Sequence, residues 1–228
     1  MGGENLGIHQ FDECSTIEEM SHVTISGQEG EPSLEAVWLG AGERIAVVAP
    51  PHPLMGGELS NPVVQALAMG FGAASARSLL FNWRGVGESS GESSGDPELA
   101  ASDYLAALAL ATRAGASVIA SGYSFGAAAA LRVGALDARV RAVIAVAPPP
   151  VLLEGCPVER LSGRCTIIAA EGDAFAPAEE LALLSKRAGA RFEILRGTDH
   201  FFGQALGRVS EIARDALSAE ALSSAEVS

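Results

Sequence analysis

The sequence predicts an α/β domain: a mostly parallel sheet of about eight strands, with helices on both faces and an antiparallel hairpin at the N-terminal end. Of the 228 residues, 48% are apolar, which is enough for a sizeable core. Short apolar runs without polar alternation recur along the chain and are typical of strands buried on both faces. Helical patterns lie between most of these runs, so the strands are joined by right-handed crossovers.

The chain reads as a single domain over residues 21–217 with an extension at each end. Residues 1–20 are acidic and irregular and predict a loose N-terminal arm. Two short runs, at 22–26 and 34–39, are separated by glycine and proline and predict the hairpin. Residues 218–228 are rich in Ser, Ala and Glu and predict a flexible tail.

The buried strands are expected at six apolar runs: 45–49, 78–81, 118–120, 142–147, 166–170 and 192–195. Asn61 followed by Pro62 is typical of a helix start, because Asn caps a helix and Pro suits its first turn. Asp96 and Pro97 open a second helix, whose buried side is expected to carry Leu105, Leu108, Ala109 and Thr112.

Charge and cysteine content narrow the function classes. The formal net charge of −13 repels phosphate backbones, so nucleic acid is not an expected partner. No segment reads as membrane-spanning, and the N-terminus lacks the pattern of a secretory signal. The three cysteines are odd in number and have no metal-ligand spacing, which predicts free thiols in the cytoplasm.

A candidate nucleophile lies in the pentapeptide Gly122-Tyr123-Ser124-Phe125-Gly126, which follows a predicted strand and precedes an alanine-rich helix. A G-x-S-x-G sequence at a strand–turn–helix junction is typical of a nucleophile elbow, where a sharp turn presents the serine hydroxyl. The flanking glycines allow neighbouring backbones to approach closely. An idle serine in a glycine-rich turn is the alternative, which the junction disfavours.

A serine hydroxyl needs a base to remove its proton, and His200 is the best candidate. It follows the last predicted strand and directly precedes the last helix. This position lies at the carboxyl ends of the strands, where ligands bind in parallel α/β folds. His9 lies in the N-terminal arm and His22 in the hairpin, both far from Ser124 in the expected topology.

The third group must accept a hydrogen bond from the imidazole, and Asp173 follows the run at 166–170 in the chain order that such sites use. Glu154, after the preceding strand, is its main rival. Asp199 cannot easily orient the ring of its own neighbour, and Glu171 points elsewhere if Asp173 points inward.

An oxyanion hole requires two backbone N–H groups. One is expected from Phe125, directly after the nucleophile. The other is expected from the proline-rich loop over residues 50–57, where Pro53 has no N–H and Leu54 is therefore the predicted donor. His52 is expected to shape this loop rather than to act as a second base.

A second glycine-rich segment, at residues 85–95, contains a short duplication. It lacks the Gly-Lys pair of a phosphate loop and the glycine spacing of a dinucleotide site. It therefore predicts a surface loop, and we expect neither a cofactor nor a metal.

Five motifs in order make the sequence resemble a small, lidless, mostly bacterial branch of the α/β-hydrolase superfamily, near dienelactone-hydrolase-like and acyl-peptidase-like predicted hydrolases: His52-Pro53-Leu54-Met55-Gly56-Gly57, Asn82-Trp83-Arg84-Gly85-Val86-Gly87-Glu88-Ser89, Gly122-Tyr123-Ser124-Phe125-Gly126-Ala127, Gly172-Asp173 and Asp199-His200-Phe201-Phe202. The resemblance covers about residues 20–215. It implies Ser124, Asp173 and His200 as a catalytic triad and Arg84 with Asn82 as loop supports.

Two residues depart from the pattern of these relatives. Pro51 stands where relatives often carry another histidine. Ser124 stands where dienelactone hydrolases carry cysteine, which argues against that particular activity.

A lid domain in this fold would lie between the strands at 142–147 and 166–170, where only residues 148–164 are available. The site should therefore be shallow and open, which suits short acyl esters or the end of a larger molecule. The residues expected around it are His52, Tyr123, Val151, Phe175, Phe201 and Phe202.

The sequence thus predicts a serine hydrolase of the carboxylesterase type, acting on a small-molecule ester through an acyl-serine intermediate. Thioester or amide cleavage would use the same groups. The alternative is a hydrolase-fold binding protein with an idle triad. The chain is expected to act as a monomer or a homodimer, since an exposed hairpin edge could pair two subunits.

Overall fold

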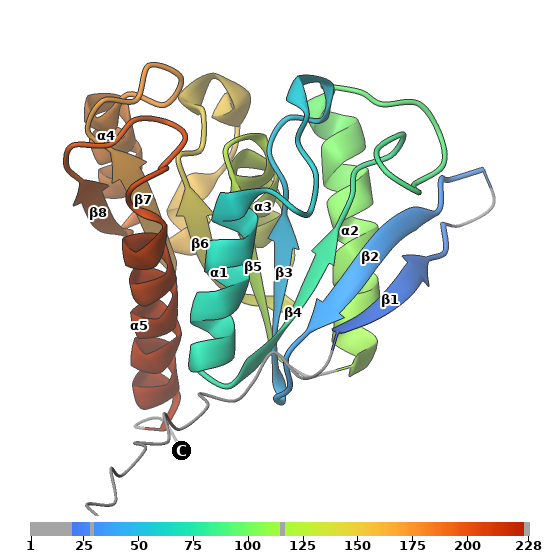
Figure 1. Ribbon diagram of the computed structural model, residues 1–228. Coiled ribbons are helices and arrows are strands. Elements are labelled where there is room, and N and C mark those ends of the chain that lie inside the picture. The colour runs from blue at the N-terminus through green and yellow to red at the C-terminus, as the bar shows by residue number, and fades with distance from the viewer. Residues whose placement is uncertain (1–19, 28–29, 115–116, 226–228) are drawn as a thin grey trace, which may run out of the picture.

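The computed structural model describes residues 20–27, 30–114 and 117–225, with side chains up to residue 218. It contains an eight-stranded sheet in the order β1-β2-β4-β3-β5-β6-β7-β8 (Figure 1). The strands are β1 (Met20–Ile25), β2 (Leu34–Leu39), β3 (Arg44–Ala49), β4 (Ala76–Phe81), β5 (Ser117–Tyr123), β6 (Val140–Val146), β7 (Cys165–Ala170) and β8 (Arg191–Leu195). The predicted α/β class and strand number are confirmed.

Strand direction follows the two kinds of sequence pattern. β1 and β2 form the predicted hairpin, and β2 also pairs antiparallel with β4. From β4 to β8 every pairing is parallel. β3 and β7, in the middle of this parallel region, are almost wholly buried along their length, as their continuous apolar sequences predict. The carboxyl ends of the parallel strands therefore share one edge of the sheet (Figure 1).

Helices cover both faces of the sheet. α1 (Pro62–Ala73) packs along α5 (Leu206–Ala225) on one face, while α2 (Pro97–Ala114) and α3 (Phe125–Leu136) pack together on the other, which α4 (Ala178–Ala188) also covers (Figure 1). Asn61 caps α1 as predicted, since its side chain accepts a hydrogen bond from the N–H of Val63.

The predicted buried face of α2 is wrong in part. Leu108 is buried, but Leu105 is exposed, and Ala109 and Thr112 are only half-buried. Asp103 and Tyr104 lie on the buried face instead. Both carry polar groups with buried partners described below, so hydrogen bonding as well as hydrophobic burial fixes the rotation of this helix.

The connection from β6 to β7 contains only two short 3₁₀ turns, η2 (Pro150–Leu153) and η3 (Val158–Leu161), so the expected absence of a lid domain is confirmed there. Of the predicted N-terminal arm, residues 1–19 lie outside the described part of the chain. α5 continues through residues 218–225 of the expected tail, and residues 226–228 are outside the description. Among the described helices, none is both long and apolar enough to cross a membrane.

Candidate active site

Ser124 lies in the turn between β5 and α3 and has a strained backbone conformation, with φ 55° and ψ −116°. A serine at positive φ costs free energy of about 1–3 kcal/mol, which the surrounding structure must supply. One fixed contact is the hydrogen bond from the N–H of Ser124 to the carbonyl of Val146, at 2.8 Å. The turn therefore has the strain that the pentapeptide pattern predicts.

The two glycines of the pentapeptide are required by close backbone packing. A Cβ atom on Gly122 would lie 2.5 Å from the backbone of Gly126. A Cβ atom on Gly126 would collide with the carbonyl oxygens of Ala49 and Pro50, at the end of β3. The first turn of α3 is thus pressed against the proline-rich loop that follows β3.

The side chains of Ser124, His200 and Asp173 lie together at the carboxyl edge of the sheet, and all three residues are buried. The Oγ of Ser124 is 3.0 Å from Nε2 of His200, and Nδ1 of His200 is 2.7 Å from Oδ2 of Asp173. A carboxylate can only accept, so Nδ1 carries the imidazole proton and Nε2 presents a lone pair to the serine hydroxyl. The structure brings together the three residues expected to carry the chemistry.

Asp173 is held by backbone groups as well as by the histidine. Its Oδ1 accepts hydrogen bonds from the N–H groups of Phe175 and Ala176, each at 2.8 Å. With Oδ1 occupied in this way, Oδ2 is directed at His200.

The three other acids considered from the sequence as partners of His200 have different surroundings. Asp199 accepts from the N–H of Phe201, and Glu171 accepts from the N–H of Gly197, both at 3.0 Å. Glu154 follows η2 and is exposed. The contact with the imidazole is made by Asp173.

Tyr123 connects the serine turn to the histidine loop. Its hydroxyl donates to the carbonyl oxygen of His200 at 2.7 Å, and the two rings lie 5.3 Å apart. Burial raises the pKa of the Tyr123 hydroxyl, which therefore stays protonated as a donor. Tyr123 is buried, and so is Phe202, so the structure places both beneath the site rather than at its open mouth.

The loop expected to complete an oxyanion hole forms a 3₁₀ turn, η1 (Pro53–Met55), capped by His52. The N–H of Leu54, the predicted second donor, already donates to Nδ1 of His52 at 3.2 Å. Phe125 is the first residue of α3, where an N–H group has no partner within the helix. The ring of His52 packs on that of Phe125, with centroids 4.8 Å apart, and burial lowers the pKa of His52.

Trp83 holds this loop in place and was not singled out from the sequence. Its indole N–H is shared between the carbonyl oxygens of Pro50 and Pro51, at 3.1 and 3.0 Å. Its ring also contacts Phe125 edge-on, with centroids 5.5 Å apart. The signal available in the sequence was a tryptophan next to the predicted loop supports, since an indole N–H needs an acceptor whenever it is buried.

Arg84 and Asn82, the loop supports implied by the resemblance, are anchored by acidic side chains, of which Asp103 is buried and Glu35 half-buried. Arg84 makes a bidentate ion pair with Asp103 of α2, with Nη2–Oδ1 at 2.7 Å and Nε–Oδ2 at 3.2 Å. The backbone N–H of Arg84 donates to the same carboxylate. Asn82 donates to Glu35 at 2.8 Å and accepts from the N–H of Leu59 at 2.7 Å.

Tyr104 ties the centre of the sheet to α2. Its hydroxyl donates toward the carbonyls of Val47 in β3 and Ser121 in β5, and accepts from the N–H of Ser121, all within 2.9 Å. These contacts lie just below the strand ends that carry the site. Neither Asp103 nor Tyr104 was identified from the sequence, because their partners are distant in the chain.

Five large apolar side chains in the loops at this edge of the sheet are exposed to solvent. They follow four different strands and are Leu54, Met55, Val151, Phe175 and Phe201. Phe175 and Phe201 flank the imidazole of His200, with ring centroids at 4.9 and 5.9 Å. Val151, Phe175 and Phe201 are thus solvent-accessible, as expected of residues bordering an open site.

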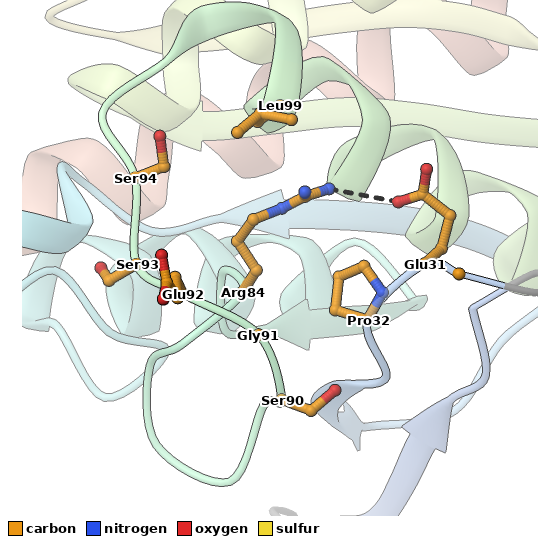
Figure 2. Close-up of a pocket in the computed structure, with 10 residues that line it drawn as sticks. Glu31, Pro32, Arg84, Ser90, Gly91, Glu92, Ser93, Ser94 and Leu99 are labelled. Carbon is orange, nitrogen blue, oxygen red and sulfur yellow. Dashed lines mark hydrogen bonds and ion pairs between the residues drawn. The ribbon is translucent and has the colours of Figure 1, made fainter.

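The glycine-rich segment at 85–95 forms a loop beside the hairpin. Together they line a cavity of about 590 Å³. Figure 2 shows Arg84 reaching across this cavity to Glu31, with which it pairs at 3.4 Å. Ser124 and His200 are not among the residues that line the cavity, so it is separate from the site.

Solved structures resemble this chain over most of its length. An α/β serine hydrolase homologue from Coxiella burnetii is 26% identical, with a TM-score of 0.76, over 88% of this chain and 99% of the other. A putative α/β hydrolase from Agrobacterium tumefaciens is 26% identical, with a TM-score of 0.75, over 87% and 95%. A lidless α/β serine hydrolase from Xanthomonas campestris is 23% identical, with a TM-score of 0.70, over 88% and 94%.

No protein-family model matches the sequence, and none of the curated proteins does. The similarity therefore rests on the fold and on the low sequence identity to the first two structures, which extends over most of the chain.

Proposed function

Because this chain belongs to the α/β-hydrolase superfamily, we propose that it is a serine hydrolase of the carboxylesterase type, with Ser124, His200 and Asp173 as its catalytic triad. The similar structures support hydrolase chemistry in general. One observation carries the finer proposal. The serine hydroxyl, the imidazole and the carboxylate form a continuous hydrogen-bonded chain, with distances of 3.0 and 2.7 Å.

In the acylation step, Oγ of Ser124 attacks the ester carbonyl carbon while its proton passes to Nε2 of His200. The resulting imidazolium is stabilised by Asp173, whose Oδ2 remains ionised. The carbon–oxygen bond to the alcohol then breaks, and Nε2 returns the proton to the departing oxygen. The products of this half-reaction are the free alcohol and an acyl group on Ser124.

In the second half-reaction, water attacks the acyl carbon and gives its proton to Nε2. The carboxylic acid leaves, and the proton on Nε2 restores the hydroxyl of Ser124. The negative oxygen formed in each half-reaction needs backbone donors. For this role we propose the N–H of Phe125, which has no partner within α3 at the start of that helix; the N–H of Leu54, the other proposed donor, is bonded to His52 and would have to leave that contact.

The open site favours a small-molecule ester with a short acyl group, while thioester or amide cleavage would use the same catalytic groups. Support comes from the absence of a lid in the described β6–β7 connection. We place the reaction in the cytoplasm, because the chain has an odd number of cysteines and both Cys156 and Cys165 are free thiols.

Labelling with a fluorophosphonate probe tests the proposal. We expect wild type to be labelled and to hydrolyse short-chain esters, and Ser124→Ala to do neither. Ser60→Ala, a change at an exposed loop serine, is the matched control and should behave as wild type. If wild type is not labelled and turns over no ester, thioester or amide, the chain is instead a hydrolase-fold binding protein with an idle triad.

A further inference from the structure

Two phenylalanines beside the base are exposed although they are large and apolar. Phe175 is 53% exposed and Phe201 is 66% exposed. Their rings lie 4.9 and 5.9 Å from the imidazole of His200. They come from different loops, one after β7 and one after β8. Two exposed aromatic rings on one buried imidazole form a patch that folding alone does not require.

The backbone at both phenylalanines is fixed by the same kind of turn. The N–H of Phe175 donates to the side chain of Asp173 two residues earlier, at 2.8 Å. The N–H of Phe201 donates to the side chain of Asp199, also two residues earlier, at 3.0 Å. Such turns fix the backbone, so each ring starts from a fixed Cα position beside the imidazole. The backbone at both positions is therefore fixed before a ligand binds, which lowers the part of the entropy cost of binding that comes from ordering these loops.

The proposed chemistry determines which part of a substrate this patch would meet. The acyl carbon must bond to Oγ of Ser124, while the departing alcohol oxygen must receive its proton from Nε2 of His200. The alcohol portion thus lies against the imidazole. Side chains that flank the imidazole are neighbours of the alcohol, whereas the acyl group lies nearer to the serine turn.

We propose that Phe175 and Phe201 bind the alcohol portion of the substrate and make the enzyme selective for alcohols that carry an aromatic ring one carbon away from the oxygen, as benzyl esters do. This inference rests on the proposed function. A substrate ring that packs against these phenylalanines beside the imidazole gains both hydrophobic burial and aromatic contacts. We expect kcat/KM for a benzyl ester to exceed that of the ethyl ester roughly 10- to 100-fold.

Acetate esters of different alcohols provide the test, with ethyl, cyclohexylmethyl and benzyl acetate as probes. All three form the same acetyl-Ser124, so water releases acetate from it at one common rate. A preference among them must therefore appear in kcat/KM, which includes acylation, and not in the rate of deacylation. Wild type should prefer benzyl acetate over ethyl acetate, with cyclohexylmethyl acetate between them.

Phe175→Ala and Phe201→Ala should each lower the benzyl-to-ethyl ratio of kcat/KM by about fivefold to tenfold. The ratio cancels any effect that the substitution has on the base itself. Leu183→Ala removes an equally exposed apolar side chain from α4, at 62% exposure, and should leave the ratio unchanged.

A second series separates the two sides of the substrate. Methyl acetate and methyl phenylacetate share their alcohol and differ in the acyl group, so their ratio should not change in Phe175→Ala or Phe201→Ala. A loss confined to methyl phenylacetate would overturn the inference by assigning the rings to the acyl group. A wild-type benzyl-to-ethyl ratio near one would also overturn it and leave the proposed function standing. If no ester is hydrolysed and the probe does not label Ser124, the proposed function fails first.

Discussion

Replacing Asp173 by Asn alters one atom of the carboxylate and should remove most of the activity. Oδ1 of Asp173 accepts two backbone hydrogen bonds, from Phe175 and Ala176. In the variant, the amide oxygen must stay at this position to accept them, so the amide NH₂ faces Nδ1 of His200. An NH₂ group can only donate, which forces Nδ1 to give up its proton and moves that proton to Nε2. The imidazole then has no lone pair for the hydroxyl of Ser124.

The residual activity depends on how easily the amide can turn around. Turning it presents the oxygen to His200 but leaves the N–H groups of Phe175 and Ala176 facing an NH₂ group. Each unsatisfied buried donor costs about 1–3 kcal/mol, so the turned state costs about 2–6 kcal/mol. Because each tenfold in rate corresponds to about 1.4 kcal/mol, the expected loss in kcat/KM is roughly 30-fold to 10⁴-fold.

The assay is kcat/KM for a short ester near neutral pH, together with the rate of fluorophosphonate labelling and the thermal midpoint of each variant. Asp199→Asn and Glu154→Gln are the matched controls. The first keeps an acceptor for the N–H of Phe201, and the second changes an exposed acid. Both should remain within about threefold of wild type. Less than a tenfold loss in folded Asp173→Asn, or a larger loss in Glu154→Gln, would refute this assignment of the acid.

Four further predictions follow from three buried groups. Asp103→Asn leaves the charge of Arg84 without its buried partner and should destabilise the fold by about 3–5 kcal/mol, lowering the thermal midpoint by roughly 6–20 °C. Tyr123→Phe leaves the carbonyl of His200 without its donor and should reduce kcat by about threefold to tenfold at unchanged KM, measured by steady-state kinetics. Burial raises the pKa of Cys165 to about 12, so native protein should resist iodoacetamide at this residue at pH 8 and react in urea, as read by peptide mass spectrometry. Because that folded pKa exceeds the ordinary value of 9.0, the unfolded chain loses the Cys165 proton at a lower pH than the folded protein does. The free energy of unfolding should therefore keep its full contribution from the protonated thiol below about pH 9 and fall toward pH 12. Urea unfolding at pH 7 and pH 10 would detect the decrease.

The strands and the three central residues were predictable because their signals are local. A strand buried on both faces needs a continuous apolar run, as in β3 and β7. A serine that must adopt a sharp turn needs glycine on both sides, and here Gly122 and Gly126 both lie against backbone. Chain order then leaves few choices for the base and the acid, since each follows the end of a strand.

The buried face of α2 could not be predicted in the same way. Its sequence is rich in alanine and leucine on several sides, so hydrophobic periodicity does not fix its rotation. The rotation depends on where Asp103 finds Arg84 and where the Tyr104 hydroxyl finds two strands. These partners are 17 to 57 residues away in the chain, so no local pattern reveals them.

The second oxyanion donor shows a different limit. Eliminating Pro53 was correct chemistry, because proline has no N–H. The N–H of Leu54 was nevertheless taken by a side chain only two residues earlier, Nδ1 of His52. That contact depends on the rotamer and the protonation state of the histidine, and both follow from its packing on Phe125 and its burial. Sequence indicates which groups can donate, whereas only the packed loop determines which of them are free.

The order of strands in the sheet explains why the supports of the two halves of the site are separate. β4 and β5 are both neighbours of β3, on opposite sides. Trp83, just after β4, therefore reaches the loop after β3 and binds the carbonyls of Pro50 and Pro51. Tyr123, at the end of β5, instead reaches the other way and binds the histidine loop after β8. Substitution of Trp83 should thus disturb the loop proposed to complete the oxyanion hole, and substitution of Tyr123 the loop of the proposed base His200, because no described hydrogen bond joins these two side chains.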